Sequence, residues 1–154
     1  ESAGVTGSLS AWMLDPQLVA DKDPRVRLQL AMTLGGTDKK LATAALLRLA
    51  RERGHERWMP AAILSSARTR PGVLLSDLLK DGQLKAPAGA LILPLSKTVS
   101  GGGDGRQLAS VLHAAAGSRP ALQQDCLKGL VAGFTGGKKL ARGSRESWST
   151  WRRW

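Results

Sequence analysis

The fold of this 154-residue chain is decided by the stretch Asp23-Pro24-Arg25-Val26-Arg27-Leu28-Gln29-Leu30-Ala31-Met32-Thr33-Leu34-Gly35-Gly36. Asp23 is a preferred N-cap residue, and Pro24 fits the first helical position, where its missing N–H does no harm. Val26, Leu30 and Leu34 recur at i, i+4 and i+8 and form one apolar face. The glycine pair at the end stops the helix. The stretch therefore predicts an amphipathic helix from residue 24 to residue 34.

Further helical patterns follow at regular intervals along the chain. We expect helices at about 37–53, 56–67, 73–79, 88–99, 106–116 and 121–134, because apolar residues recur there with helical spacing. Alternate helices thus start roughly every 32 residues, which lies in the range of helical-hairpin repeats. The residues expected to face inward on these later helices include Leu41, Ala42, Ala45, Leu46, Leu49, Leu108, Val111, Leu112, Ala115, Leu122, Cys126, Leu130 and Val131.

Composition agrees with an all-α fold. The apolar residues are mostly Leu and Ala, which favour helices, and the chain has one Phe and no Tyr, whereas strands draw on β-branched and aromatic residues. We therefore predict an all-α protein, a short right-handed solenoid of about three and a half stacked helical hairpins. Two local departures are expected: Pro94 kinks or splits the fifth helix, and the glycine-rich residues 101–105 form a flexible loop.

The chain divides into three parts by pattern. Residues 1–22 are expected to be a lead-in, in which Trp12 and Leu14 cover the first repeat. Residues 23–137 hold the helical repeats. Residues 138–154 form a basic tail with three of the five Trp beside arginine, and we expect it to be disordered because Gly and Ser weaken any helix there. Trp with Arg is also the composition of peptides that bind membrane surfaces.

The pattern from Asp23 to Gly35 resembles the first-helix signature of HEAT repeats, including those of the phycobilisome-lyase type. The resemblance implies that Arg27 braces adjacent repeats against an acidic loop residue, with Asp23 at that acidic position. It implies that Ala31 is the small residue at the helix contact. The later repeats depart from this signature, since the second unit has Arg57-Trp58-Met59 where Val-Arg would stand.

Residues 20–135 are also similar to the helical-repeat segment of planctomycete-type putative membrane-bound dehydrogenases or haem-binding proteins, through Asp23–Gly36 and Trp58–Ser66. That resemblance implies a β-propeller upstream, a cytochrome c domain downstream and a periplasmic or cell-envelope location. The chain does not begin with Met, and we expect it to be a piece of such a longer bacterial protein. Its own role would be that of a non-catalytic interaction or spacer module, with a protein partner or neighbouring domains of the same chain.

The sequence contains few residues that could form a catalytic or metal-binding site. Cys126 is the single cysteine, so no internal disulfide, CxxC or CxxCH can form, and we expect it to be buried as a small apolar residue. His55 and His113 lie in different units, and no cluster of His, Cys and acids suggests a metal site. The sequence therefore predicts no catalytic, cofactor-binding or metal-binding residues. No apolar run approaches the ~20 residues of a membrane span.

Charge supports one alternative role. The net charge is +11, and residues 25–70 carry ten basic and three acidic residues. A basic balance of this kind either is a solvated surface or binds an anionic partner such as nucleic acid. In the second case Trp58 could stack on a base, although it could equally pack between repeats. The candidate basic face consists of Arg25, Arg48, Arg51, Arg53, Arg57, Arg68 and Arg70.

Overall fold

The computed structural model describes residues 16–36, 39–81, 84, 89–102 and 104–150, and for residues 16, 39, 40 and 136–150 it describes the backbone alone. Every regular element within these ranges is helical, which confirms the all-α prediction. The elements in chain order are α2 (Pro16–Val19), α3 (Pro24–Thr33), the 3₁₀ turn η1 (Leu34–Gly36), α4 (Lys39–Arg53), α5 (Met59–Ser66), the 3₁₀ turn η2 (Ala67–Thr69), α6 (Pro71–Lys80), α8 (Ile92–Gly102), α9 (Gly105–Ala116) and α10 (Pro120–Thr150).

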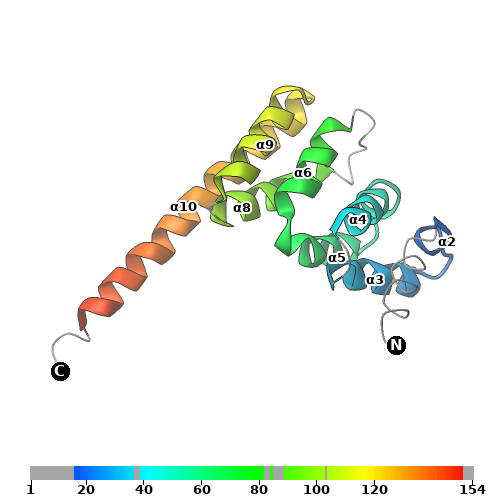
Figure 1. The fold of residues 1–154 in the computed structure, drawn as a ribbon, viewed down its shortest axis with the longest axis horizontal. Coiled ribbons are helices and arrows are strands. Elements are labelled where there is room, and N and C mark those ends of the chain that lie inside the picture. The colour runs from blue at the N-terminus through cyan, green and yellow to red at the C-terminus, as the bar shows by residue number, and fades with distance from the viewer. Residues whose placement is uncertain (1–15, 37–38, 82–83, 85–88, 103, 151–154) are drawn as a thin grey trace, which may run out of the picture.

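The helices form an elongated array (Figure 1). The helix α3 packs against α5, α4 packs against α5 and α6, and α6 packs in turn against α8 and α9. The most extensive contact joins α8 to α10. The array therefore has a group of helices at each end, with α6 between them, and the last part of α10 projects away from both groups (Figure 1).

Local sequence explains where the helices begin. The side chain of Asp23 accepts a hydrogen bond from the backbone N–H of Arg25 at 2.8 Å, so it caps α3 as predicted. Asp104 caps α9 in the same way. The helix α8 begins at Ile92, so Pro94 lies in its first turn, where the missing N–H breaks no hydrogen bond. The helix predicted over 88–99 is therefore interrupted, but at residues 90–91, which form a turn before α8, and not at Pro94 itself.

The core is built from Leu and Ala on the facing sides of these helices. It includes Leu30, Ala31, Leu34, Leu46, Leu49, Ile63, Leu74, Leu75, Leu78, Ile92, Leu95, Val111, Leu122, Cys126 and Leu130, all of them buried. Four side chains that we expected to face inward are instead 37–62% exposed: Val26, Leu41, Leu112 and Val131. Each lies at the edge of its apolar stripe, and on α3 the neighbouring Arg27 is buried in place of Val26.

Glycine does not end the last helices where the sequence suggested. The helix α8 extends through Gly102 and α9 starts at Gly105, so most of the expected 101–105 loop is helical. The helix α10 runs through Gly136–Gly137, where we placed its end, to Thr150. The backbone of 138–150, expected in a disordered tail, is thus helical in the structure.

Two glycines of α10 bring it close to α8. A Cβ atom on Gly129 would overlap with the carbonyl oxygen of Leu93, and one on Gly133 would overlap with Ser100 and the carbonyl oxygen of Lys97. Because glycine has no Cβ, the two helix backbones can approach closely here. The α8–α10 contact therefore depends on residues that the apolar pattern alone does not mark.

At the N-terminal end, α2 packs on α3 and α4 and contributes the buried Val19 to the core. The cover that we expected from Trp12 and Leu14 lies outside the described residues. Within the described ranges, no helix combines the length and the apolar character needed to cross a membrane.

Candidate interaction surface

The contact between α3 and α5 contains a buried ion pair. The Arg27 side chain is only 7% exposed, and its guanidinium donates to both carboxylate oxygens of Glu56, at 2.5 and 3.3 Å. It also donates to the backbone carbonyl of Asp21. Arg53, at the end of α4, lies 3.9 Å from the same Glu56 carboxylate. Glu56 precedes α5, so this pair joins the start of α3 to the loop that leads into α5.

The acidic partner of Arg27 differs from the residue that the family resemblance indicated. The Asp23 carboxylate binds the backbone of Arg25, which makes Asp23 the cap of α3 and leaves the pairing with Arg27 to Glu56. Glu56 stands in the loop before α5 much as Asp23 stands before α3. An acidic residue at that equivalent place is the sequence signal that marks Glu56.

The α3–α5 contact is tightly packed at the C-terminal ends of the two helices. Ala31 is 0% exposed, and its backbone carbonyl accepts a hydrogen bond from the Ser66 hydroxyl at 2.6 Å. A Cβ atom on Gly35 would lie 3.0 Å from the Cα atom of Ser66, so the backbones nearly touch. The helices α3 and α5 are therefore in close contact at their C-terminal ends.

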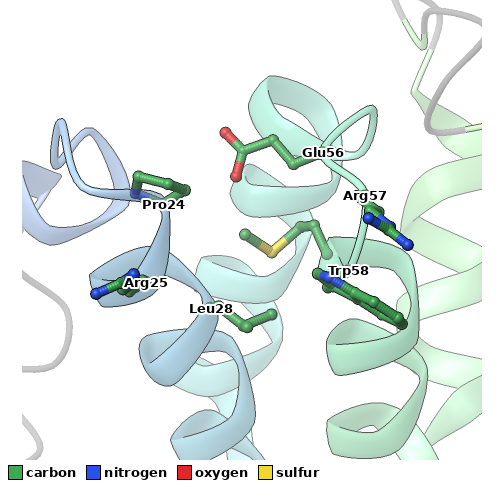
Figure 2. Close-up of a pocket in the computed structure, with 7 residues that line it drawn as sticks. Pro24, Arg25, Leu28, Glu56, Arg57 and Trp58 are labelled. Atoms are coloured by element: carbon green, nitrogen blue, oxygen red, sulfur yellow. The ribbon is translucent and has the colours of Figure 1, made fainter.

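Their N-terminal ends leave a cavity of about 210 Å³, which we call the α3/α5 hollow. Figure 2 shows Leu28 of α3 pointing into the space between the two helices, with Arg25 and Arg57 on opposite sides of it. The side chain of Met59, which is 1% exposed, also lines the hollow. The residues that line the hollow are Pro24, Arg25, Leu28, Glu56, Arg57, Trp58 and Met59.

An exposed aromatic side chain lies at the edge of the hollow. Trp58 precedes α5 and is 60% exposed, so it does not pack between the helices as one of our two expectations held. The Arg57 guanidinium lies 5.0 Å from the centre of its ring, a cation–π arrangement. Figure 2 shows the indole lying alongside α5, on the same side as Arg57.

The remaining arginines of the candidate basic face lie elsewhere. Three belong to the second half of α4, and each has an acidic neighbour: Arg48 pairs with Glu52 at 2.8 Å, Arg51 pairs with Asp81, and Arg53 lies near Glu56. Arg68 and Arg70 lie at the opposite end of α5 from Arg57, and the Arg70 guanidinium is 3.5 Å from the Thr43 hydroxyl. The seven residues are thus divided among three places.

The described residues hold little reactive chemistry. They contain no group of three or more His, Cys, Asp or Glu side chains that could hold a metal ion. Cys126 is fully buried, as predicted, and this burial raises the pKa of its thiol. A thiol in that state is mostly protonated and shielded from solvent, so it is a poor nucleophile.

The chain matches no protein-family model, no curated protein and no solved structure with which it was compared. Among the described residues, the α3/α5 hollow combines concavity, an exposed aromatic ring and two guanidinium groups that form no ion pair.

Proposed function

We propose that this chain is a non-catalytic helical-repeat module that binds a protein partner or holds neighbouring domains of a larger protein. The order of helix contacts supports stacked hairpins of the HEAT-like kind: α4, α6 and α9 begin at residues 39, 71 and 105 and pack in that order. In this interpretation α3 and α5 are the matching helices of the first two hairpins, and α8 and α10 those of the next two. Repeat proteins built in this way present extended binding surfaces.

Polar contacts between successive units also support stacking. The Gln107 side chain accepts a hydrogen bond from the Gly72 N–H at 3.0 Å, across 35 positions. The Ser66 hydroxyl binds the Ala31 carbonyl, also across 35 positions, and Arg27 binds Glu56 across 29. Each contact joins one expected hairpin to the next. Repeats that contact only their neighbours give this kind of spacing.

The α3/α5 hollow is the observation that carries the binding role. Trp58 is too exposed to serve the core, and exposed tryptophans beside a concave surface are frequent anchors of protein interfaces. To test the role, a displayed library of random peptides is selected on the folded chain, with the urea-unfolded chain as the control. We expect one recurring peptide pattern that only the folded chain retains. Failure to enrich any pattern would contradict the binding role.

The wider context comes from the resemblance to the repeat segment of planctomycete-type dehydrogenases. In that context the module would separate or hold redox domains, and no redox chemistry would lie in the segment itself. The coding sequence on either side of the segment tests this. We expect a strand-rich propeller upstream and a CxxCH motif downstream, and their absence from the full reading frame would remove the redox context while leaving the binding role intact.

Binding of single-stranded nucleic acid is the alternative that one observation favours. The exposed Trp58 ring with Arg57 beside it is the kind of pair on which a base can stack. If this is the function, the affinity for a single-stranded oligonucleotide falls steeply with salt, and Trp58→Ala weakens it at every salt concentration. Loss of all affinity near physiological salt would argue against this alternative.

A further inference from the structure

The α3/α5 hollow has a size that suits a side chain rather than a cofactor. Its volume of about 210 Å³ is below the ~300–1,000 Å³ that is usual for sites that enclose small-molecule ligands. The central wall is apolar, with Leu28 from α3 and the buried Met59 from α5. One large apolar side chain of a partner would gain by leaving water here.

The rim of the hollow carries uncompensated positive charge. Arg25 and Arg57 are exposed, and neither forms an ion pair with another described residue. Glu56, in the wall of the hollow, is paired with Arg27, and the Asp23 carboxylate caps α3. The rim therefore favours an anionic partner, and guanidinium groups bind carboxylates through paired hydrogen bonds.

The exposed Trp58 adds a rigid surface beside the anchor position. The Arg57 guanidinium lies 5.0 Å from the ring centre, and the Trp58 side chain is 60% exposed. A Trp side chain has only two rotatable χ angles, so it loses little freedom when a partner covers it. The apolar wall, the aromatic edge and the two flanking arginines thus lie around one concave site (Figure 2).

We infer that the α3/α5 hollow binds an acidic protein segment that inserts one large apolar side chain between Leu28 and Met59 and places carboxylates against Arg25 and Arg57. This inference rests on the proposed binding role and names the partner chemistry. A nucleic acid fits the site less well, because the interior formed by Leu28 and Met59 is mainly apolar and favours an aliphatic or aromatic side chain over a phosphate or a sugar.

The peptide library tests this when it is selected on the wild-type chain and counter-selected on Trp58→Ala. We expect the enriched sequences to share a Leu, Met, Phe or Trp flanked by Asp and Glu. A synthetic twelve-residue peptide with a central Leu-Phe pair among Asp and Glu is then labelled, and its binding is measured by fluorescence anisotropy. Two matched peptides complete the set: one with Ala-Ala at the centre, the other with Asn and Gln in place of the acids.

Expected effects follow from the geometry. Trp58→Ala should weaken binding about 30-fold, as at interface hot spots. The double variant Arg25→Gln with Arg57→Gln should weaken it about tenfold, because two exposed charge contacts are lost. The control double variant Arg68→Gln with Arg106→Gln removes the same charge from exposed sites outside the hollow, and it should leave affinity unchanged. Circular dichroism checks that every variant is folded.

Four results would overturn the inference. The first two are failure of the Leu-Phe peptide to bind, and equal binding of the Leu-Phe and Ala-Ala peptides. The other two are an equal loss of affinity in the Arg25/Arg57 and Arg68/Arg106 double variants, and tighter binding of an oligo-dT than of the Leu-Phe peptide. Enriched peptides of another chemistry would overturn it while leaving the proposed binding role in place. A selection that enriches no pattern at all would remove both.

Discussion

The α3–α5 contact and the α8–α10 contact join helices in opposite ways. Between α3 and α5, the close approach is confined to one end, at Ala31 and Ser66, while the other end is held by the long side chains of Arg27 and Glu56. Between α8 and α10, the glycines at 129 and 133 let one backbone lie directly on the other. The long side chains of the α3–α5 contact leave a cavity beside them, whereas Gly129 and Gly133 leave no room even for a Cβ atom.

The two contacts therefore differ in whether they leave space between the helices. The α8–α10 contact has no space for a ligand at its glycines, so it serves to hold the array together. The α3–α5 contact gives up packing at the N-terminal ends and gains the hollow with its exposed Trp58. Substitutions can disrupt either contact separately, and the resulting losses of stability should differ in size.

The largest effect is expected at Gly133. Replacing a helical Gly by Ala normally stabilises a helix by up to ~1 kcal/mol. Here the new methyl group would overlap with Ser100 and with the Lys97 carbonyl, which belongs to a helix backbone and cannot turn aside. We expect Gly133→Ala to destabilise by about 3 kcal/mol through overpacking, measured by urea unfolding.

Gly101 provides the matched control for that substitution. It lies in the last turn of α8, and a Cβ atom there would have no neighbour within 4 Å. Gly101→Ala should therefore leave stability unchanged or raise it by about 0.5 kcal/mol. A similar loss in both variants would mean that glycine in α10 does not set the distance between α8 and α10.

The second effect concerns Arg27 and Glu56 at the contact of α3 with α5. Arg27→Met should destabilise by about 2 kcal/mol, because it leaves the Glu56 carboxylate, which is 18% exposed, with the more distant Arg53 as its ion-pair partner among the described residues. A double-mutant cycle with Glu56→Gln should give a coupling energy of about 1–2 kcal/mol. The exposed pair Arg48–Glu52 is the control, and its coupling should stay below about 0.5 kcal/mol.

A smaller effect is expected at the closed end of the same contact. Ser66→Ala removes the hydrogen bond to the Ala31 carbonyl, and a buried bond of this type contributes about 1 kcal/mol. Thermal unfolding measures the loss. Ser65→Ala, which changes an exposed neighbour on the same helix, should have almost no effect. A loss larger than that of Arg27→Met would reverse our view of which end holds α3 to α5.

The smallest effect is one of pH, at the start of α9. Hydrogen bonds from Gln107 and Arg106 hold the pKa of Asp104 below its ordinary value of 3.8. A carboxyl group with a lowered pKa adds stability above its unfolded pKa, and that contribution disappears as the pH falls through the folded pKa. Asp104→Ser keeps a cap but does not titrate. The melting temperature of the wild type should exceed that of Asp104→Ser above pH 3.8, and the difference should shrink in more acidic solution.

The all-α class, but little of the site, could be predicted from the sequence. The start of α3 followed from Asp23 and Pro24 because capping is local, and Ala31 was correctly placed at a contact. Residues at the edges of the apolar stripes, such as Val26, were wrongly expected to be buried, because the apolar pattern does not fix how far a helix is rotated about its axis. Glycine was taken as a stop signal, yet in α10 it serves a contact with a helix about 30 residues earlier in the chain.

The hollow could not be predicted for a related reason. The spacing of apolar residues indicates which faces meet but not whether two helices meet along their whole length. Trp58 was open to two interpretations until its exposure was known. The family resemblance implied that Arg27 pairs with Asp23, whereas its partner is Glu56, 29 positions away and two residues before Trp58.

The contacts between successive units also bear on how the chain folds. The side-chain links described above, including Arg70–Thr43, Arg27–Glu56 and Gln107–Gly72, span between 27 and 35 positions. Loops of that length close at a modest entropic cost, because the cost grows only with the logarithm of loop length. Each of these contacts can form once the second of its two helices has been synthesised, so that folding can proceed from the N-terminus while the rest of the chain is still on the ribosome.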